Sequence, residues 1–270
     1  YEAINIRYQE YYACKFQVPI ANTLEETIKN ALEMIGEGAL RTGGERDVPL
    51  YIWRTSHFQN WYQAQKSAGN RLDGAKVEWT FRVGPKRGFV FFWILHVNVY
   101  ITKENRNKTN EVVISRPDIA TIVMYQKKAD LYNTDIVLIR EFRSPVTTSD
   151  GYVWEVPGGS SFKPKGDPLV LAANECEEET GLKIESSRIK KHEARQLVAT
   201  LSAHKAHLFS VEITDQELDW LRSQQGIAHG VVEDTERTYV EIMKLGEICK
   251  QASVDWSMLG MILSVLVHKI

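Results

Sequence analysis

The stretch GGSSFKPKGDPLVLAANECEEETGL, residues 158–182, runs from a Gly-Gly turn into a strongly acidic segment. Its apolar and small residues recur with the period of an α-helix, and Gly181 stands where helices commonly end. These residues are Leu169, Ala172, Ala173, Cys176 and Thr180. We therefore expect a helix over residues 168–181 with its apolar side against a core.

The acidic residues of this helix are the first functional signal. Glu175, Glu178 and Glu179 are three and four positions apart, which predicts a shared stripe, whereas Glu177 points elsewhere. Neighbouring carboxylates disfavour one another's ionisation, and only Lys183 offers a cation nearby. A solvated helix face is the ordinary explanation. The alternative is a bound Mg²⁺ or Mn²⁺ ion, since hard divalent cations prefer oxygen ligands and phosphates.

The segments around this helix alternate between strand and helix patterns. Mixed elements with short connections favour an α/β fold, a mixed sheet between helices. The expected strands are 118–126, 134–142, 151–159, 207–213 and 238–244, and the expected further helices are 215–224 and 255–269.

The first part of the chain predicts a separate α+β region. A capping-box pattern at Thr23 and Glu26 opens a helix. Residues 101–111 are polar and aperiodic, so we interpret them as a loop between two domains, 1–110 and 111–270. The other expected elements are strands at 47–53, 76–83 and 89–101 and a helix at 57–66.

Charge and cysteine content narrow the class of protein only a little. Residues 1–110 hold 15 basic and 11 acidic side chains, whereas residues 111–270 hold 18 and 24, which suggests separate roles. Three cysteines without a paired spacing favour a reducing intracellular compartment. The longest apolar runs, 89–101 and 258–267, fall short of the roughly 18 residues of a membrane span, so no membrane partner is expected.

The acidic helix and its lead-in resemble the Nudix hydrolase superfamily. Residues 158–182 are similar to the Nudix box, and LIREFRSP…GYVWEVPGG (138–159) is similar to the lead-in of the ADP-ribose pyrophosphatase branch. The matching positions of the box are Glu175, Cys176, Glu178, Glu179, Gly181 and Leu182. The resemblance covers about residues 112–270 and implies a Nudix-type α/β/α sandwich that hydrolyses nucleoside diphosphates linked to another moiety.

The box also departs from the family pattern. Asn174 stands where the family has an arginine, and Gly166 or Asp167 stands where it has an earlier glutamate. An amide lacks the charge that strengthens an arginine's hydrogen bonds to carboxylates. The resemblance therefore leaves three alternatives open: an active pyrophosphohydrolase, a weakened domain that binds nucleotides or an RNA 5′ end, and an RNA 5′-end pyrophosphohydrolase.

The resemblance implies a set of site residues. The expected Mg²⁺ or Mn²⁺ ligands are Glu175, Glu178 and Glu179. Glu175 is in addition expected to be a catalytic residue. Glu233 and Glu236, on a late loop, are candidates for the general base, with a solvated acidic loop as the alternative. The candidates for substrate binding are Arg140, Arg143, Trp154, Gly158 and Gly159, with surface ion pairs as the alternative for the arginines and core packing for Trp154.

The first 110 residues suggest further partners. Aromatic residues there are interleaved with basic ones, as single-stranded nucleic acid requires, although a small packed domain is the plainer interpretation. Such N-terminal segments in the ADP-ribose branch also cover the substrate or exchange across a dimer. A homodimer is therefore a further expectation. A complex with another protein through the apolar predicted helix 255–269 is a separate one. The interleaved residues include Trp53, Arg54, Phe58, Trp61, Tyr62, Lys66, Trp79, Phe81 and Arg82.

Overall fold

The computed structural model describes residues 25, 26, 28, 41–160, 166–231 and 236–267. The chain divides into two compact units. The first comprises Tyr1–Pro49, Gly69–Lys76 and Val97–Glu111, and the second comprises Leu50–Ala68, Val77–His96 and Val112–Ile270. The boundary predicted at residue 110 falls inside a strand, β3 (Arg106–Ser115). Within the described residues, no helix combines the length and apolar character that a membrane crossing needs.

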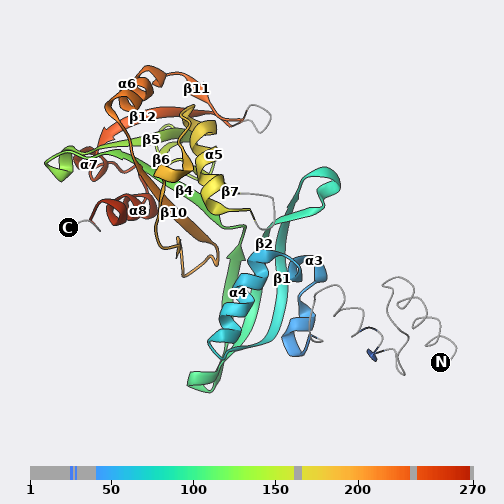
Figure 1. Ribbon diagram of the computed structural model, residues 1–270. Coiled ribbons are helices and arrows are strands. Elements are labelled where there is room, and N and C mark those ends of the chain that lie inside the picture. Colours follow the sequence, from blue (N-terminus) through green and yellow to red (C-terminus); the bar gives the residue numbers. More distant parts are fainter. Residues whose placement is uncertain (1–24, 27, 29–40, 161–165, 232–235, 268–270) are drawn as a thin grey trace. The chain divides into compact units, whose positions relative to one another are not determined.

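The second unit is built around a mixed nine-stranded sheet (Figure 1). Its main strand order is β11-β12-β5-β4-β10-β8, while β6 pairs with β5, β7 with β4 and β9 with β10. The pairing of β4 with β10 is parallel, whereas β5 is antiparallel to β4, β6 and β12. The strands are β4 (Ile119–Gln126), β5 (Asp135–Phe142), β6 (Tyr152–Glu155), β7 (Gly158–Ser160), β8 (Lys190–Lys191), β9 (Arg195–Gln196), β10 (Lys205–Glu212), β11 (Ala228–His229) and β12 (Thr238–Lys244).

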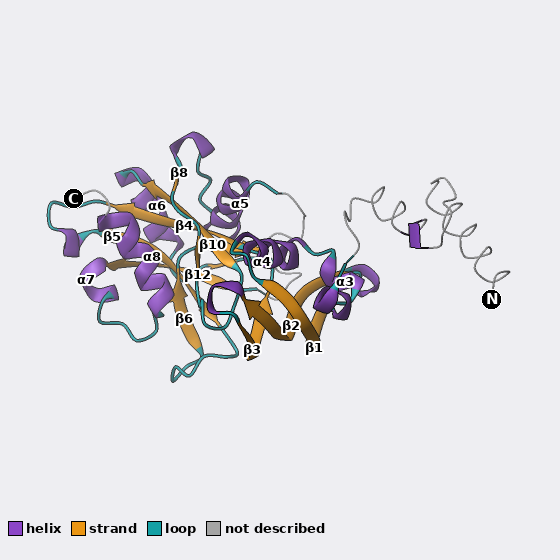
Figure 2. Cartoon of the chain, turned by 90° about the horizontal axis from the view of Figure 1, so that it is seen from below, coloured by secondary structure: helices purple, strands orange, loops and turns teal. Residues whose placement is uncertain are grey.

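Helices cover both faces of this sheet and enclose two hydrophobic cores (Figure 2). On one face, α5 (Pro168–Thr180) and α6 (Asp215–Gln224) pack on Ile122, Met124 and Val137. On the other face, α7 (Leu245–Ile248) and α8 (Trp256–Val267) pack on Val123, Ile136 and Leu138. Alternate residues of β4 and β5 therefore enter opposite cores, as the two-residue period of a strand requires. The predicted α/β class, a mixed sheet with helices, is confirmed.

Strands β4 and β5 separate along their length, and the β6–β7 segment fills the opening. They pair at Met124–Gln126, but further along β4 pairs with β7 and β5 with β6. The Pro157 carbonyl accepts hydrogen bonds from the Ile122 amide (2.9 Å) and the Thr121 hydroxyl (3.0 Å). This bridging satisfies backbone groups that would otherwise be buried without partners. It also interrupts the single strand predicted for 151–159, which is two strands.

Helix α5 has clear local reasons to begin and end where it does. The Asp167 side chain caps its first turn by accepting the Leu169 amide at 2.9 Å, and Pro168 occupies the first helical position. Gly181 follows in the left-handed conformation, with φ of 75°. Ala172 and Cys176 face the core. The helix starts and stops as predicted.

A three-stranded sheet in the order β1-β2-β3 occupies the N-terminal part of the described chain, with β1 at Arg71–Val83 and β2 at Phe89–Ile101. Helix α4 (Ser56–Ser67) follows the short helix α3 (Leu50–Trp53). Phe58 of α4 packs edge-on against Trp93 of β2, with ring centroids 5.7 Å apart. The short 3₁₀ turns of the described chain are Gly43–Asp47, Pro85–Arg87, Thr102–Glu104, Leu131–Asn133 and Ser186–Arg188.

Two of the predicted N-terminal elements are wrong. Residues 47–53 form helical turns instead of a strand, and the predicted loop 101–111 contains most of β3. The helix predicted from Thr23 lies outside the described residues apart from 25, 26 and 28. Several of the interleaved aromatic rings are buried, namely Trp53, Phe58 and Tyr62. Trp79 and Phe81 are exposed and stacked at 5.8 Å, so this pair is accessible for the predicted contact with RNA.

Candidate metal centre

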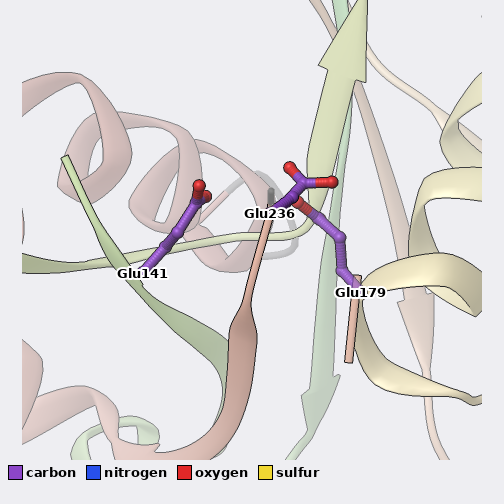
Figure 3. Close-up of side chains that lie close together, drawn as sticks. All are labelled: Glu141, Glu179 and Glu236. Carbon is purple, nitrogen blue, oxygen red and sulfur yellow. The ribbon is translucent and has the colours of Figure 1, made fainter. Parts of the chain in front are cut away.

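Three carboxylates from distant parts of the chain meet beside the end of α5. One oxygen each of Glu141, Glu179 and Glu236 lie within 4.8 Å of one another. Figure 3 shows Glu179 reaching from α5 towards Glu236, with Glu141 on the neighbouring strand β5. Glu141 and Glu179 are buried and Glu236 is half-buried. Buried acids without matching cations are costly, so a bound cation is the arrangement's natural complement.

Glu179 is the most deeply placed of these acids, only 1% exposed. Its Oε2 accepts the Gly158 amide at 2.8 Å, while its Oε1 is buried without a hydrogen-bond partner. Its own backbone carbonyl accepts the Thr238 hydroxyl at 2.9 Å. Both ends of the residue are thus fixed, and one carboxylate oxygen is left without a hydrogen-bond partner. An orphaned buried oxygen of this kind fits a metal ligand.

Glu175 lies one helical turn earlier, against the second glycine of the pair. A Cβ placed on Gly159 would be 2.4 Å from Glu175 Oε1, and a Cβ on Gly158 would be 2.6 Å from the Ala120 carbonyl oxygen. Each position therefore needs a glycine for a different steric reason. Gly158 permits close pairing of β7 with β4, and Gly159 makes room for a carboxylate. Their predicted role in binding substrate stays a prediction.

The pKa values of these acids are raised above the ordinary range. Burial raises the pKa of Glu175 to about 7, and the charges of Glu178 and Glu236 add to the effect. Burial also raises the pKa of Glu141 to about 7, against the opposing influence of Arg143. Burial also raises the pKa of Glu179 well above its ordinary value, although the hydrogen bond from the Gly158 amide opposes this. A divalent cation among them would favour the ionised forms.

Glu141 and Glu175 are accordingly expected to cost the metal-free chain stability as pH rises. They have folded pKa values near 7 against an ordinary 4.5, so the folded state holds their protons more tightly between these values. Their joint contribution to stability is greatest near pH 5 and falls through pH 7. Each shift alone would cost about 3 kcal/mol. Solvent screening of half-buried Glu175 reduces this, so we expect roughly 2–4 kcal/mol, or a fall in Tm of roughly 5–10 °C.

Thermal unfolding of chelator-treated protein at pH 5 and pH 8, with and without Mn²⁺, measures this effect. Mn²⁺ should restore most of the lost stability at pH 8. His57 acts in the opposite direction between pH 5 and about 6.5, because burial lowers its pKa to about 4. The variant Glu141→Gln/Glu175→Gln keeps His57 and is therefore the reference. A Tm difference between native chain and this variant that is the same at pH 5 and pH 8 without metal would contradict the expectation.

Arg143 is tied to acids instead of projecting alone. Its Nη2 lies 2.7 Å from Glu141 Oε2, and its Nε and Nη2 donate to Glu155 Oε2 at 3.0 and 2.7 Å. Desolvation lowers the pKa of Arg143, but the charges of Glu155 and Glu141 outweigh it and the net shift is upward. The predicted substrate-binding role of Arg143 remains a prediction, but its described contacts make it a counter-ion within the cluster.

Arg140 and Trp154 belong to the other face of the sheet. They are register partners on β5 and β6, and Arg140 precedes Glu141, so its side chain alternates away from the acids. Arg140 donates to Asp150 at 3.2 Å and lies 4.1 Å from the centre of the Tyr152 ring. Trp154 packs against the core beneath α8. The structure therefore does not bring these two substrate-binding candidates to the carboxylates.

The remaining predicted acids fall in different places. Glu178 is exposed, so the stripe predicted for Glu175, Glu178 and Glu179 is divided between solvent and interior. Glu177 is exposed as predicted, and Lys183, the one cation near the stripe, lies 3.5 Å from its carboxylate. Glu233 lies outside the described residues. Asn174 is exposed, so the position of the missing arginine faces solvent.

Sequence reasoning missed Glu141. Its signal is the alternation of β5, in which Val137, Ile139 and Glu141 share one face, so a charged residue continues a buried row. No model of a known protein family matches the sequence, and no curated protein is significantly similar to it. The candidate site therefore depends on its own geometry: three carboxylates, two of them buried, that offer only oxygen donors, the kind that Mg²⁺ or Mn²⁺ binds.

Proposed function

We propose that the chain is a metal-dependent pyrophosphohydrolase of the Nudix type that cleaves nucleoside-diphosphate-linked compounds, with ADP-ribose as the leading candidate substrate. One observation carries the proposal. The carboxylates of Glu175 and Glu179 lie against the Gly158–Gly159 segment at the mouth of the β4–β5 opening, with Glu236 beside them. Acids in that position suit a phosphate-bridging cation better than they suit a solvated helix face.

Each acid has a distinct part in this proposal. Glu175, Glu178 and Glu179 hold Mg²⁺ or Mn²⁺, and Glu178, the exposed member, faces the side from which solvent and substrate arrive. The bound cation supplies charge neutralisation at the pyrophosphate oxygens. Glu236 is half-buried near Glu179 and accepts the proton of the attacking water. Its position two residues before β12 fixes the backbone beside it while leaving the carboxylate at the edge of the cluster.

Release of AMP or another nucleoside monophosphate is the direct test. Native chain should hydrolyse ADP-ribose, or another member of a panel of dinucleotides, nucleotide sugars and capped RNA, only with Mg²⁺ or Mn²⁺. The double variant Glu178→Gln/Glu179→Gln should lose at least about 100-fold in rate, about 2.7 kcal/mol of transition-state stabilisation. Glu177→Gln is the matched control, because this exposed acid on the same helix contacts Lys183 instead.

The alternatives are separated by the same experiment. Folded native chain that binds a nucleotide of the panel without turning it over would favour the binding module. Turnover confined to capped or triphosphate RNA would favour the RNA 5′-end enzyme. Neither turnover nor nucleotide binding, with metal present and the fold verified by circular dichroism, would reject the proposal.

A further inference from the structure

Glu141 is held in the acidic cluster by the sheet itself. Glu141 pairs with Thr238 of β12 on one side and with Val153 of β6 on the other, so a strand flanks it on each side. Thr238 in turn donates its hydroxyl to the backbone carbonyl of Glu179 at 2.9 Å. One residue thus links the backbone positions of both buried acids. Glu141 is 7% exposed and does not depend on a loop for its placement.

Arg143 fixes the direction of the Glu141 side chain. Its Nη2 is within 2.7 Å of both Glu141 Oε2 and Glu155 Oε2, and its Nε provides a second hydrogen bond to Glu155. The contact with Glu141 is an ion pair that lacks the alignment of a hydrogen bond, since Glu141 Oε2 has no hydrogen-bond partner. The guanidinium therefore steers Glu141 without saturating its oxygens.

The charges around Arg143 do not balance. Glu141, Glu155, Glu175, Glu178, Glu179 and Glu236 carry a formal −6 when ionised, against Arg143, which contacts two of them, and Arg116, which lies within electrostatic reach of Arg143. One divalent cation would leave the group at −2, whereas two would bring it to zero. A second, independent observation is that Glu179, which is only 1% exposed, keeps its Oε1 buried without a hydrogen-bond partner.

We infer that Glu141, Glu179 and Glu236 form a deep divalent-cation position, separate from the one on Glu175 and Glu178, and that Arg143 positions Glu141 for it instead of binding substrate. The inference rests on the proposed function only in placing both cations in one reaction site. The donors are oxygens throughout, which selects Mg²⁺ or Mn²⁺ over softer metals. The deep position uses an acid from the sheet, an acid from α5 and an acid from the segment before β12. Glu179 is thereby shared between the two positions, and Glu236 binds through one carboxylate oxygen, which leaves the other to accept the proton of the attacking water.

Counting bound Mn²⁺ on the full chain tests this assignment. We expect two Mn²⁺ per chain by isothermal titration calorimetry and electron paramagnetic resonance at pH 7.5 without substrate. Glu141→Gln should bind one, and Glu236→Gln, which changes a less buried residue of the same position, should also bind one. Glu177→Gln is the control and should bind two. One Mn²⁺ on the native chain, or two on Glu141→Gln at native affinity, would overturn the inference.

Arg143 is tested by graded replacement. Arg143→Gln should weaken the deep Mn²⁺ at least about tenfold and leave the outer one near its native affinity. Arg143→Lys keeps the charge without the planar fork and should fall between the two. If Arg143 instead held substrate, both variants would bind two Mn²⁺ normally and raise only KM. If the native chain binds two Mn²⁺ but shows no turnover, the proposed hydrolase activity is rejected and the deep cation position is retained. If it shows turnover with one bound Mn²⁺, the deep position is rejected and the hydrolase activity is retained.

Discussion

Replacement of Glu179 by glutamine is expected to make the metal-free chain more stable while it removes hydrolysis. Glu179 is 1% exposed, and its Oε1 has no partner, so the native carboxylate is costly to keep ionised inside the protein. Glutamine keeps an oxygen that can accept the Gly158 amide but carries no charge. We expect a gain of roughly 1–2 kcal/mol at pH 8, or roughly 2–6 °C in Tm, and a loss of about 100-fold or more in rate.

Thermal melts of chelator-treated native chain and Glu179→Gln at pH 8, beside metal-dependent release of nucleoside monophosphate, give the two numbers. The gain should shrink at pH 5, where native Glu179 is protonated because its pKa is raised by burial. Mn²⁺ should raise the Tm of the native chain much more than that of the variant. If Glu179→Gln is less stable than the native chain at pH 8, the Glu179 carboxylate stabilises the fold and the expectation is wrong.

Replacement of the two adjacent glycines by alanine is expected to have different effects: Gly158→Ala should lower stability, whereas Gly159→Ala should lower metal affinity and rate. A Cβ on Gly158 would lie 2.6 Å from the Ala120 carbonyl oxygen and 2.8 Å from Thr121 Cα, both rigid parts of β4. A Cβ on Gly159 would meet the Glu175 carboxylate, the movable end of a side chain, at 2.4 Å. Gly158→Ala should therefore cost about 1–3 kcal/mol of stability, as overpacking commonly does.

Gly159→Ala should leave the Tm within about 2 °C of native and instead lower metal affinity and rate, by roughly 10–100-fold, because Glu175 must turn away from the site. Chemical denaturation and Mn²⁺ titration of both variants separate the two effects. Gly226→Ala is unsuitable as a control, because Gly226 has a positive φ of 83°. Gly260→Ala is suitable, because a Cβ there meets nothing within 4 Å. Equal stability of Gly158→Ala and Gly159→Ala would contradict this distinction.

Much of the second unit was predictable from local pattern. The Thr214–Glu217 capping box, which the structure contains, accompanies a helix at 215–224 with the predicted bounds, and β12 also matches its predicted range. Alternation and capping are local properties, so a sequence shows them directly. The strand predicted at 47–53 failed because a short apolar run suits either conformation. Trp53 there packs against Phe58 and Tyr62 of α4.

Long-range pairing explains the other failures. The polar residues of β3 form a strand because β2 lies beside them, and no local pattern announces that partner. The candidate site shows the same limit. Glu175 and Glu179 were identified on one helix, but Glu141 sits 38 positions before Glu179, and only the folded sheet brings it and Glu236 together. The placement of Arg140 and Trp154 away from the carboxylates shows the same limit, since the face of a strand decides which neighbour a side chain meets.

The parallel pairing of β4 with β10 has a consequence for how the molecule forms. Ala206 pairs with Ile119, a separation of 87 positions, and the intervening chain contains β5, β6, β7 and α5. The centre of the sheet can close only after a ribosome has delivered this whole crossover, and non-local closure of this kind is slow. Nascent chains that stop before residue 205 leave the apolar edge of β4 uncovered, which makes that edge a natural target for chaperones.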